Sequence, residues 1–190
     1  MCGRYNFSKD PADEKTAALI SMMERKYPGE YKTGEIFPGD TAPGIIERHG
    51  KIVPVPATFG FPGIQESKLL INARPETAAE KKTFAESLRN RRIILPATGF
   101  YEWSHDSQKT KYLFTIGDRL IVYLCGIYRI IDGQVRFVIL TREANESMIE
   151  THNRMPVTVK ESEVRDYLTD YQFAIDALSA VAPELVRQAV

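Results

Sequence analysis

The feature that most constrains the fold is a run of β-rich segments between residues 91 and 141. β-branched and aromatic residues, which favour strands, dominate RRIILPA, KYLFTIG, RLIVYLCGIYRII and QVRFVILT. Gly117-Asp118 and Asp132-Gly133 separate the last three segments, and such pairs are typical of hairpin turns. The segments are therefore expected to pair with their neighbours along the chain.

Residues 44–57 predict another pair of strands, joined at His49-Gly50. Helical patterns flank the strands: Asp10-Pro11 is a typical helix start, followed by an amphipathic stretch up to Tyr27. Further helices are predicted at 76–90, 143–151, 161–168 and 175–189. Sequential hairpins rather than alternating strands and helices predict an α+β fold with a mainly antiparallel, barrel-like sheet.

Composition excludes several classes of protein. No linker, repeat or low-complexity tract interrupts residues 1–190, so we expect a single compact domain, long enough to bury a core. There is no apolar run of about 18 residues and no secretory signal pattern, which predicts no membrane partner. The two cysteines do not make a disulfide framework, which predicts the cytoplasm. Zero net charge argues against bulk coating of nucleic acid but permits a local basic groove.

Cys2 stands directly after the initiator methionine. Removal of Met1 would leave an α-amine and a thiol on adjacent carbons, and this pair can close a five-membered ring on an aldehyde. A cysteine at the start of a chain can also be accidental. Cys125 lies in the apolar stretch IVYLCGIY and is expected to be buried and inert.

Four short stretches place polar residues where a fold alone does not require them. They are MCGRY, LINARPET, GFYEW and THNRMP. In structural terms, Asn72 would cap a turn, Glu102 would lie on the solvent face of an edge strand, and His152 would be an ordinary structural histidine. Arg74 and Arg154 would then be surface charges. These interpretations stand beside functional ones.

In functional terms, Glu102 lies between Tyr101 and Trp103, where desolvation would favour its protonated form and suit acid–base chemistry. Arg74 and Arg154 would grip phosphate oxygens in two places. Other chemistries lack their motifs: there is no CxxC, HxxxH, GxxxxGK[ST], GxGxxG or GxSxG. We therefore expect no metal and no cofactor.

In this order and spacing, MCGR, INARPET, GFYEW and HNRMP resemble the motifs of the SRAP family, the SOS-response-associated peptidase-like or abasic site processing proteins. The resemblance runs from Met1 to about Val159. It implies a compact α+β domain around a barrel-like core, in agreement with the strand pattern. It also implies single-stranded DNA containing abasic sites as the partner, a monomeric state, and association with the nucleoid when bound to DNA.

The resemblance assigns roles to seven residues. The chain would remove Met1 by a thiol autopeptidase activity, and Cys2 would crosslink to the ring-opened abasic deoxyribose as a thiazolidine, in a lyase-like reaction. Asn72 would orient the amine, His152 would pass a proton to the sugar ring oxygen, and Glu102 would shuttle protons. The positions that line the DNA path would be Arg4, Arg74 and Arg154.

The sequence departs from the family pattern in two places. The segment FGFPGIQESK lacks the tryptophans that relatives often carry, so base stacking would depend on Phe59, Phe61 or Ile64. In EIFPGD, the carboxylates of Glu35 and Asp40 would weaken the attraction for phosphate if they face the DNA groove.

Two other functions fit the same motifs. The first is an N-terminal-nucleophile amidase or peptidase, in which Cys2 attacks an amide with its own amine as base. The second is a non-catalytic module that binds single-stranded DNA.

Overall fold

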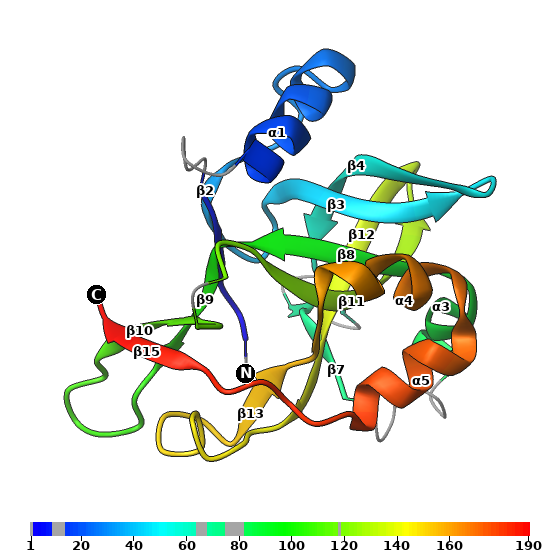
Figure 1. The fold of residues 1–190 in the computed structure, drawn as a ribbon. Helices are drawn as coiled ribbons and strands as arrows, with labels where there is room; N and C mark the ends of the chain where they lie inside the picture. The colour runs from blue at the N-terminus through cyan, green and yellow to red at the C-terminus, as the bar shows by residue number, and fades with distance from the viewer. Residues whose placement is uncertain (1, 9–13, 64–67, 75–81, 118) are drawn as a thin grey trace.

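The computed structural model describes residues 2–8, 14–63, 68–74, 82–117 and 119–190 (Figure 1). The described strands are β1 (Tyr5–Phe7), β2 (Gly34–Ile36), β3 (Thr41–Arg48), β4 (Lys51–Phe59), β5 (Phe61–Pro62), β6 (Leu69–Leu70), β7 (Asn72–Ala73), β8 (Arg92–Ala97), β9 (Gly99–Trp103), β10 (Lys111–Thr115), β11 (Val122–Ile131), β12 (Gln134–Glu143), β13 (Arg154–Pro156), β14 (Thr158–Val159) and β15 (Val186–Ala189). The described helices are α1 (Glu14–Lys26), α3 (Lys82–Asn90), η1 (Glu161–Glu163), α4 (Val164–Thr169) and α5 (Tyr171–Ser179). The fold is α+β, as predicted.

The larger sheet closes into a barrel. Strand β12 pairs with β4 on one side and β11 on the other, and β3 and β8 complete the ring. Neighbouring strands of the ring are antiparallel, except that β12 and β4 are parallel. Every residue of β8 is buried, because one face of the strand lines the barrel and the other lies under helices. The barrel-like, mainly antiparallel core is thus confirmed.

The smaller sheet packs against the barrel and carries the N-terminal segment. Among the described residues its strand order is β15-β10-β9-β1-β2. Tyr5, Phe100 and Phe114 point inward from this sheet into a core shared with the barrel. The rings of Phe100 and Phe114 stack with centroids 5.4 Å apart. The described chain begins at Cys2, whose carbonyl accepts a hydrogen bond from Asn72 of β7, and continues into β1 of the smaller sheet (Figure 1).

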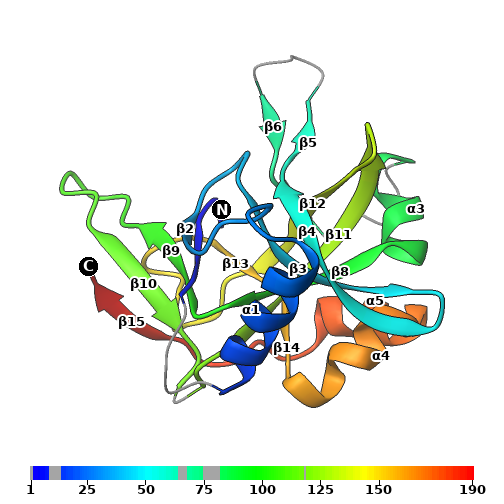
Figure 2. The same cartoon turned by 90° about the horizontal axis from the view of Figure 1, so that it is seen from above.

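Helices α3, α4 and α5 cover one outer side of the barrel, while α1 lies at another side (Figures 1 and 2). The buried Arg92 on β8 ties two of these helices to the barrel. Its guanidinium donates to the carbonyls of Leu88 (2.9 Å), Tyr167 (2.6 Å) and Leu168 (2.9 Å). These carbonyls lie near helix C-termini, where a cation is favoured. Among the described residues, no helix is long and apolar enough to cross a membrane.

The structure confirms the hairpins at His49-Gly50 and Asp132-Gly133. The predicted hairpin between residues 111–117 and 119–131 is wrong. Strand β10 pairs with β9 and β15, whereas β11 belongs to the barrel, so the chain passes from one sheet to the other at this point. Local composition predicts a turn here, but partner strands are chosen by burial over long sequence distances.

Two predicted helices also need correction. Residues 146–151 form turns with bonds such as Thr151 N–H to the Met148 carbonyl, rather than a helix over 143–151. Of the stretch 175–189, α5 takes the part up to Ser179, and β15 then pairs with β10. The helices predicted up to Tyr27 and at 161–168 are confirmed in their described parts. Asp10-Pro11 and residues 76–81 lie outside the described residues.

Candidate active site

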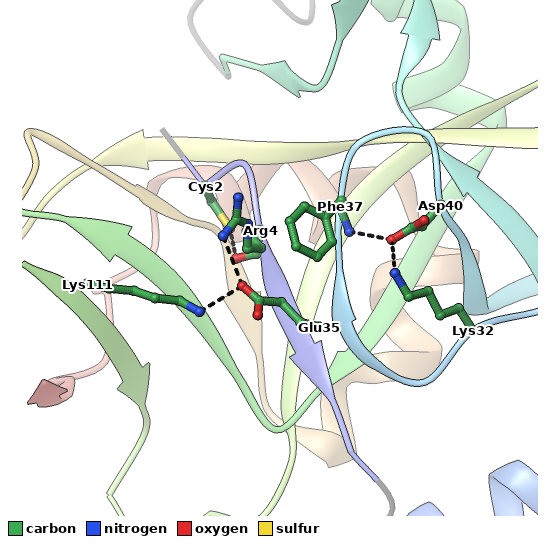
Figure 3. A network of polar contacts seen from close by, with 7 residues as sticks. All are labelled: Cys2, Arg4, Lys32, Glu35, Phe37, Asp40 and Lys111. Carbon is green, nitrogen blue, oxygen red and sulfur yellow. Dashed lines mark hydrogen bonds and ion pairs between the residues drawn. The ribbon is translucent and has the colours of Figure 1, made fainter. Parts of the chain in front are cut away.

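Cys2 lies buried between the two sheets. Its exposed fraction is 0%, and its thiol contacts the carbonyl of Arg4 with Sγ and O 3.9 Å apart (Figure 3). Burial, and to a smaller degree the negative charge of Glu102, raise the pKa of the Cys2 thiol well above its ordinary value. The thiol in this closed site is therefore protonated at neutral pH.

Asn72 holds the backbone at Cys2. It begins β7, opposite Ile139 of β12, and its Nδ2 donates to the carbonyl of Cys2 at 3.0 Å. A second, longer contact of 3.5 Å joins Nδ2 to the carbonyl of Ile139. The buried Oδ1 has no hydrogen-bond partner among the described residues. The side chain thus reaches across the structure to the N-terminal segment instead of capping a local turn.

Glu102 points into the protein from the middle of β9. Side chains alternate along a strand, so Phe100 and Glu102 face inward while Tyr101 and Trp103 lie on the opposite face. Glu102 is only 5% exposed, which excludes the solvent-face interpretation. The two flanking aromatics are not what buries it, contrary to the sequence-based expectation. Its charge acts on both Cys2 and His152, so the three side chains share one site.

His152 follows the turns of 146–151 and is half-buried. Its Nδ1 accepts a hydrogen bond of 2.9 Å from the backbone N–H of Arg154. Partial burial lowers the pKa of His152, although the negative charge of Glu102 opposes this shift. The imidazole is therefore neutral near pH 7, and because Nδ1 accepts, Nε2 carries the proton.

His105 is a neighbour of the site that the sequence did not single out. Its ring lies 5.1 Å from that of His152, centroid to centroid. It comes from the loop between β9 and β10, far from His152 in the sequence, so the fold rather than a local motif brings the two rings together. Among the described residues, no group of three or more His, Cys, Asp or Glu side chains is arranged to hold a metal ion.

The three arginines have different environments. Arg74 is exposed and lines a hollow of about 390 Å³ together with Asn153 and Arg154. Arg154 itself is only 8% exposed, and its guanidinium donates to the carbonyl of Thr141. The expected exposed phosphate fork therefore fits Arg74 but not Arg154. The backbone of Arg154 instead positions His152.

Arg4 forms an ion pair with Glu35, with Nη1 and Oε1 3.0 Å apart, and its guanidinium lies over the rings of Phe37 and Trp103. The sequence did not point to these rings, nor to Lys111, which also binds Glu35. Lys111 lies opposite Trp103 in the β9–β10 pairing. The alternation in GFYEW indicated that Trp103 shares a face with Tyr101, but no local signal identified the partner strand.

Phe59 and Phe61 offer no stacking face for a DNA base. Both are fully buried, and the ring of Phe59 stacks on Phe137 with centroids 5.0 Å apart. Ile64 lies outside the described residues. Of the three positions considered for base stacking, the two described ones therefore serve the core.

The fold and the site together define a class: an α+β barrel protein whose buried N-terminal cysteine is held by an asparagine amide and faces a carboxylate and an imidazole. The family model described as SOS response associated peptidase (SRAP) matches residues 1–188. The chain belongs to this family.

Several relatives carry the name abasic site processing protein. The chain is 32% identical to YoaM of Bacillus subtilis strain 168 over 199 residues, covering 95% of this chain and 85% of that protein. It is 35% identical to YoqW of the same bacterium over 188 residues, covering 88% of this chain and 80% of that protein. It is 28% identical to YedK of Escherichia coli K12 over 179 residues, covering 88% and 79%.

Solved structures support the fold. A crystal structure of a Bacteroides thetaiotaomicron protein matches with a TM-score of 0.75 at 20% identity, covering 100% of this chain and 92% of that chain. The crystal structure of a phage-related protein from Bordetella bronchiseptica matches with a TM-score of 0.75 at 22% identity, covering 100% and 94%.

Proposed function

We propose that this chain recognises abasic sites in single-stranded DNA and crosslinks to them through Cys2 after Met1 has been removed. The observation that carries the proposal is the hydrogen bond from Asn72 Nδ2 to the Cys2 carbonyl, in a site that also contains Glu102 and His152. The relatives are named abasic site processing proteins, which supports the abasic site as the lesion that is recognised. The stable product would shield the lesion from strand cleavage until repair.

The first step frees the amine. Hydrolysis of the Met1–Cys2 peptide bond adds water, releases methionine and leaves the α-amine on Cys2. The thiol is the candidate nucleophile for this autopeptidase step, and Glu102 is the charged neighbour that can accept its proton. The bond from Asn72 is made to the carbonyl side of Cys2, so it is kept after cleavage and continues to orient the new amine.

The amine then attacks the aldehyde. A free α-amine has a reference pKa of about 7.7–8.0, so part of it is neutral at physiological pH and can add to C1′. Loss of water gives an imine. The Cys2 thiol next adds to the same carbon: the S–C bond forms, and the thiol proton goes to the imine nitrogen by way of Glu102. The sum is aldehyde plus aminothiol giving thiazolidine plus water.

His152 acts on the sugar in this scheme. The closed deoxyribose must open before an aldehyde exists, and the ring oxygen must then receive a proton. A neutral imidazole with its proton on Nε2 is suited to donate it. The Arg154 N–H fixes this tautomer by occupying Nδ1. After His152 has donated its Nε2 proton, Glu102 can supply a new proton to this nitrogen, because both side chains lie in the same site.

Single strands suit this site because no partner strand blocks C1′ and because cations can follow the backbone without reading sequence. Arg74 is exposed and lines a hollow together with Asn153, the residue that follows His152, so it is the first candidate for a phosphate contact. A monomeric state, cytoplasmic location and nucleoid association remain predictions.

Intact-mass spectrometry tests the proposal. Purified protein should begin at Cys2, and mixing it with an abasic single-stranded oligonucleotide should add the mass of the oligonucleotide minus one water. An amidase would instead release product from a panel of peptides and amides, and a binding module would do neither. Crosslinked protein that still carries Met1 would contradict the proposed chemistry, because the amine would be blocked.

The two arginines near the hollow should behave differently. Arg74→Ala should weaken binding of undamaged single-stranded DNA and reduce the salt slope of log K by about 0.7, the value for one lost phosphate contact. Arg154→Ala should mainly lower the unfolding temperature, because it removes a buried guanidinium that bonds to the Thr141 carbonyl. Fluorescence anisotropy against salt, together with thermal unfolding, separates the two effects. An unchanged slope in Arg74→Ala would place this residue outside the DNA path.

A further inference from the structure

Two cations converge on one carboxylate oxygen beside Cys2. Arg4 Nη1 lies 3.0 Å from Glu35 Oε1, and Lys111 Nζ lies 2.8 Å from the same oxygen (Figure 3). The point at which both donors meet is a position for an anionic oxygen. Arg4 is two residues from Cys2, and its carbonyl contacts the Cys2 thiol, so this position adjoins the proposed reaction centre.

Aromatic rings hold both cations independently of Glu35. The guanidinium of Arg4 lies 4.1 Å from the ring centre of Phe37 and 4.6 Å from that of Trp103. Lys111 Nζ lies 4.0 Å from the ring centre of Tyr101. Cation–π contacts of this kind favour a fixed position for each charge. Removal of the carboxylate would therefore leave the two cations in place.

The cluster is accessible to a ligand. The side chains of Arg4, Glu35 and Lys111 are 29%, 29% and 26% exposed. They lie on the face of the smaller sheet that carries Tyr101 and Trp103, whereas Glu102 points to the other face. Glu35 comes from β2, and its side chain has enough rotatable bonds to swing aside while β2 stays paired with β1.

Glu35 remains ionised in this setting. Partial desolvation alone would raise its pKa, but hydrogen bonds from Lys111 and Arg4 outweigh that effect and lower it. The cluster of two cations and one carboxylate thus has a net charge of +1. Displacing Glu35 would expose both positive charges to an incoming anion.

We propose that Arg4 and Lys111 form a binding site for a backbone phosphate of single-stranded DNA, and that Glu35 occupies this site as an internal competitor when DNA is absent. The identity of the partner rests on the proposed function. Lys111 becomes a DNA-binding residue in this scheme. Glu35 sets the affinity, because a phosphate must replace its carboxylate to reach both cations.

The second carboxylate of this region has a different role. Asp40 Oδ2 accepts from Lys32 Nζ at 2.8 Å and from the backbone N–H of Phe37 at 2.9 Å. It therefore fixes the turn that presents Phe37, and its charge is used within that turn. The concern that both acidic residues repel DNA thus applies to Glu35 rather than to Asp40.

The test measures binding of an undamaged, fluorescently labelled single-stranded oligonucleotide by anisotropy across salt concentrations. Glu35→Gln should bind about three- to tenfold tighter at low salt, with a salt slope steeper by about 0.7. Lys111→Met, which keeps much of the stem against Tyr101, should bind more weakly with a slope reduced by about 0.7. Glu86→Gln is the matched control: Glu86 lies on α3, and its replacement makes the same change in charge but breaks an ion pair with Arg91, which follows that helix.

The double variant Glu35→Gln/Lys111→Met decides between a local and a global effect. If the site is real, the gain from Glu35→Gln should be mostly lost when Lys111 is absent, because the two changes share one phosphate. A gain of equal size with and without Lys111, or a Glu35→Gln variant that matches Glu86→Gln, would overturn the proposal. Thermal unfolding checks that each variant is folded.

Trp103 gives a local readout, because it is the only tryptophan in the chain and lies beside both cations. Its emission should change when the undamaged oligonucleotide binds, and the change should shrink in Lys111→Met. Emission that stays constant during binding would count against the site. Crosslinking of an abasic oligonucleotide is measured separately. Loss of crosslinking with the Glu35 and Lys111 effects retained would reject the proposed function alone, and the reverse result would reject this inference alone.

Discussion

Replacing Cys2 with alanine is expected to abolish the stable crosslink to an abasic oligonucleotide while leaving most of the DNA binding. Alanine keeps the α-amine, so an imine still forms at C1′, but no thiol is present to close the ring. The imine should be trapped by borohydride and should hydrolyse without it. Denaturing gels, run with and without borohydride, measure both species.

Cys125→Ala is the control for this experiment. Cys125 is fully buried in β11 within the core beneath α3, α4 and α5, and burial raises the pKa of its thiol well above the ordinary value. Its replacement should cost only some packing stability and leave crosslinking unchanged. If Cys125→Ala removed the crosslink and Cys2→Ala did not, the reactive cysteine would be misassigned.

Much of the fold could be predicted from local sequence patterns. The β-branched and aromatic content of residues 91–97 and 134–141 identified their strands, and Asp132-Gly133 identified the hairpin between β11 and β12. Pairing between distant strands was not accessible in this way. The return of the C-terminal residues to β10 as β15 depends on that sheet having an open edge, and a short exposed strand carries no strong local signal.

For the site as well, the residues could be predicted from the sequence, but their long-range contacts could not. Motif order identified Cys2, Asn72, Glu102 and His152, and the structure brings these four together from separate segments. The sequence did not reveal that Arg154 turns inward, because an arginine before Met-Pro has the same local pattern whether its side chain is buried or exposed. Lys111 was missed for a related reason, since its role depends on strand β2 supplying Glu35.

Glu102→Gln is expected to slow crosslink formation by about 10²-fold or more, the lower range for general acid–base catalysis. Glutamine keeps the size and much of the hydrogen bonding of a side chain that is only 5% exposed, but it cannot accept or return a proton. In the proposed scheme the protonated thiol must lose its proton as the S–C bond forms, and Glu102 is the charged group that acts on it. Reversal of the crosslink should slow as well, because ring opening passes through the same proton transfers.

Single-turnover crosslinking followed on gels across pH, for the parent and for Glu102→Gln, measures this effect. His152→Gln is the informative comparison, because His152 is assigned to opening of the sugar rather than to the thiol step. A small open-chain aldehyde, supplied in place of the abasic site, needs no sugar opening. With this substrate, the rate of thiazolidine formation should recover more in His152→Gln than in Glu102→Gln. Thermal unfolding of each variant guards against a structural loss. Equal crosslinking rates for the parent and Glu102→Gln at every pH would remove Glu102 from the mechanism, and the proton of the thiol would then have to go directly to the imine nitrogen.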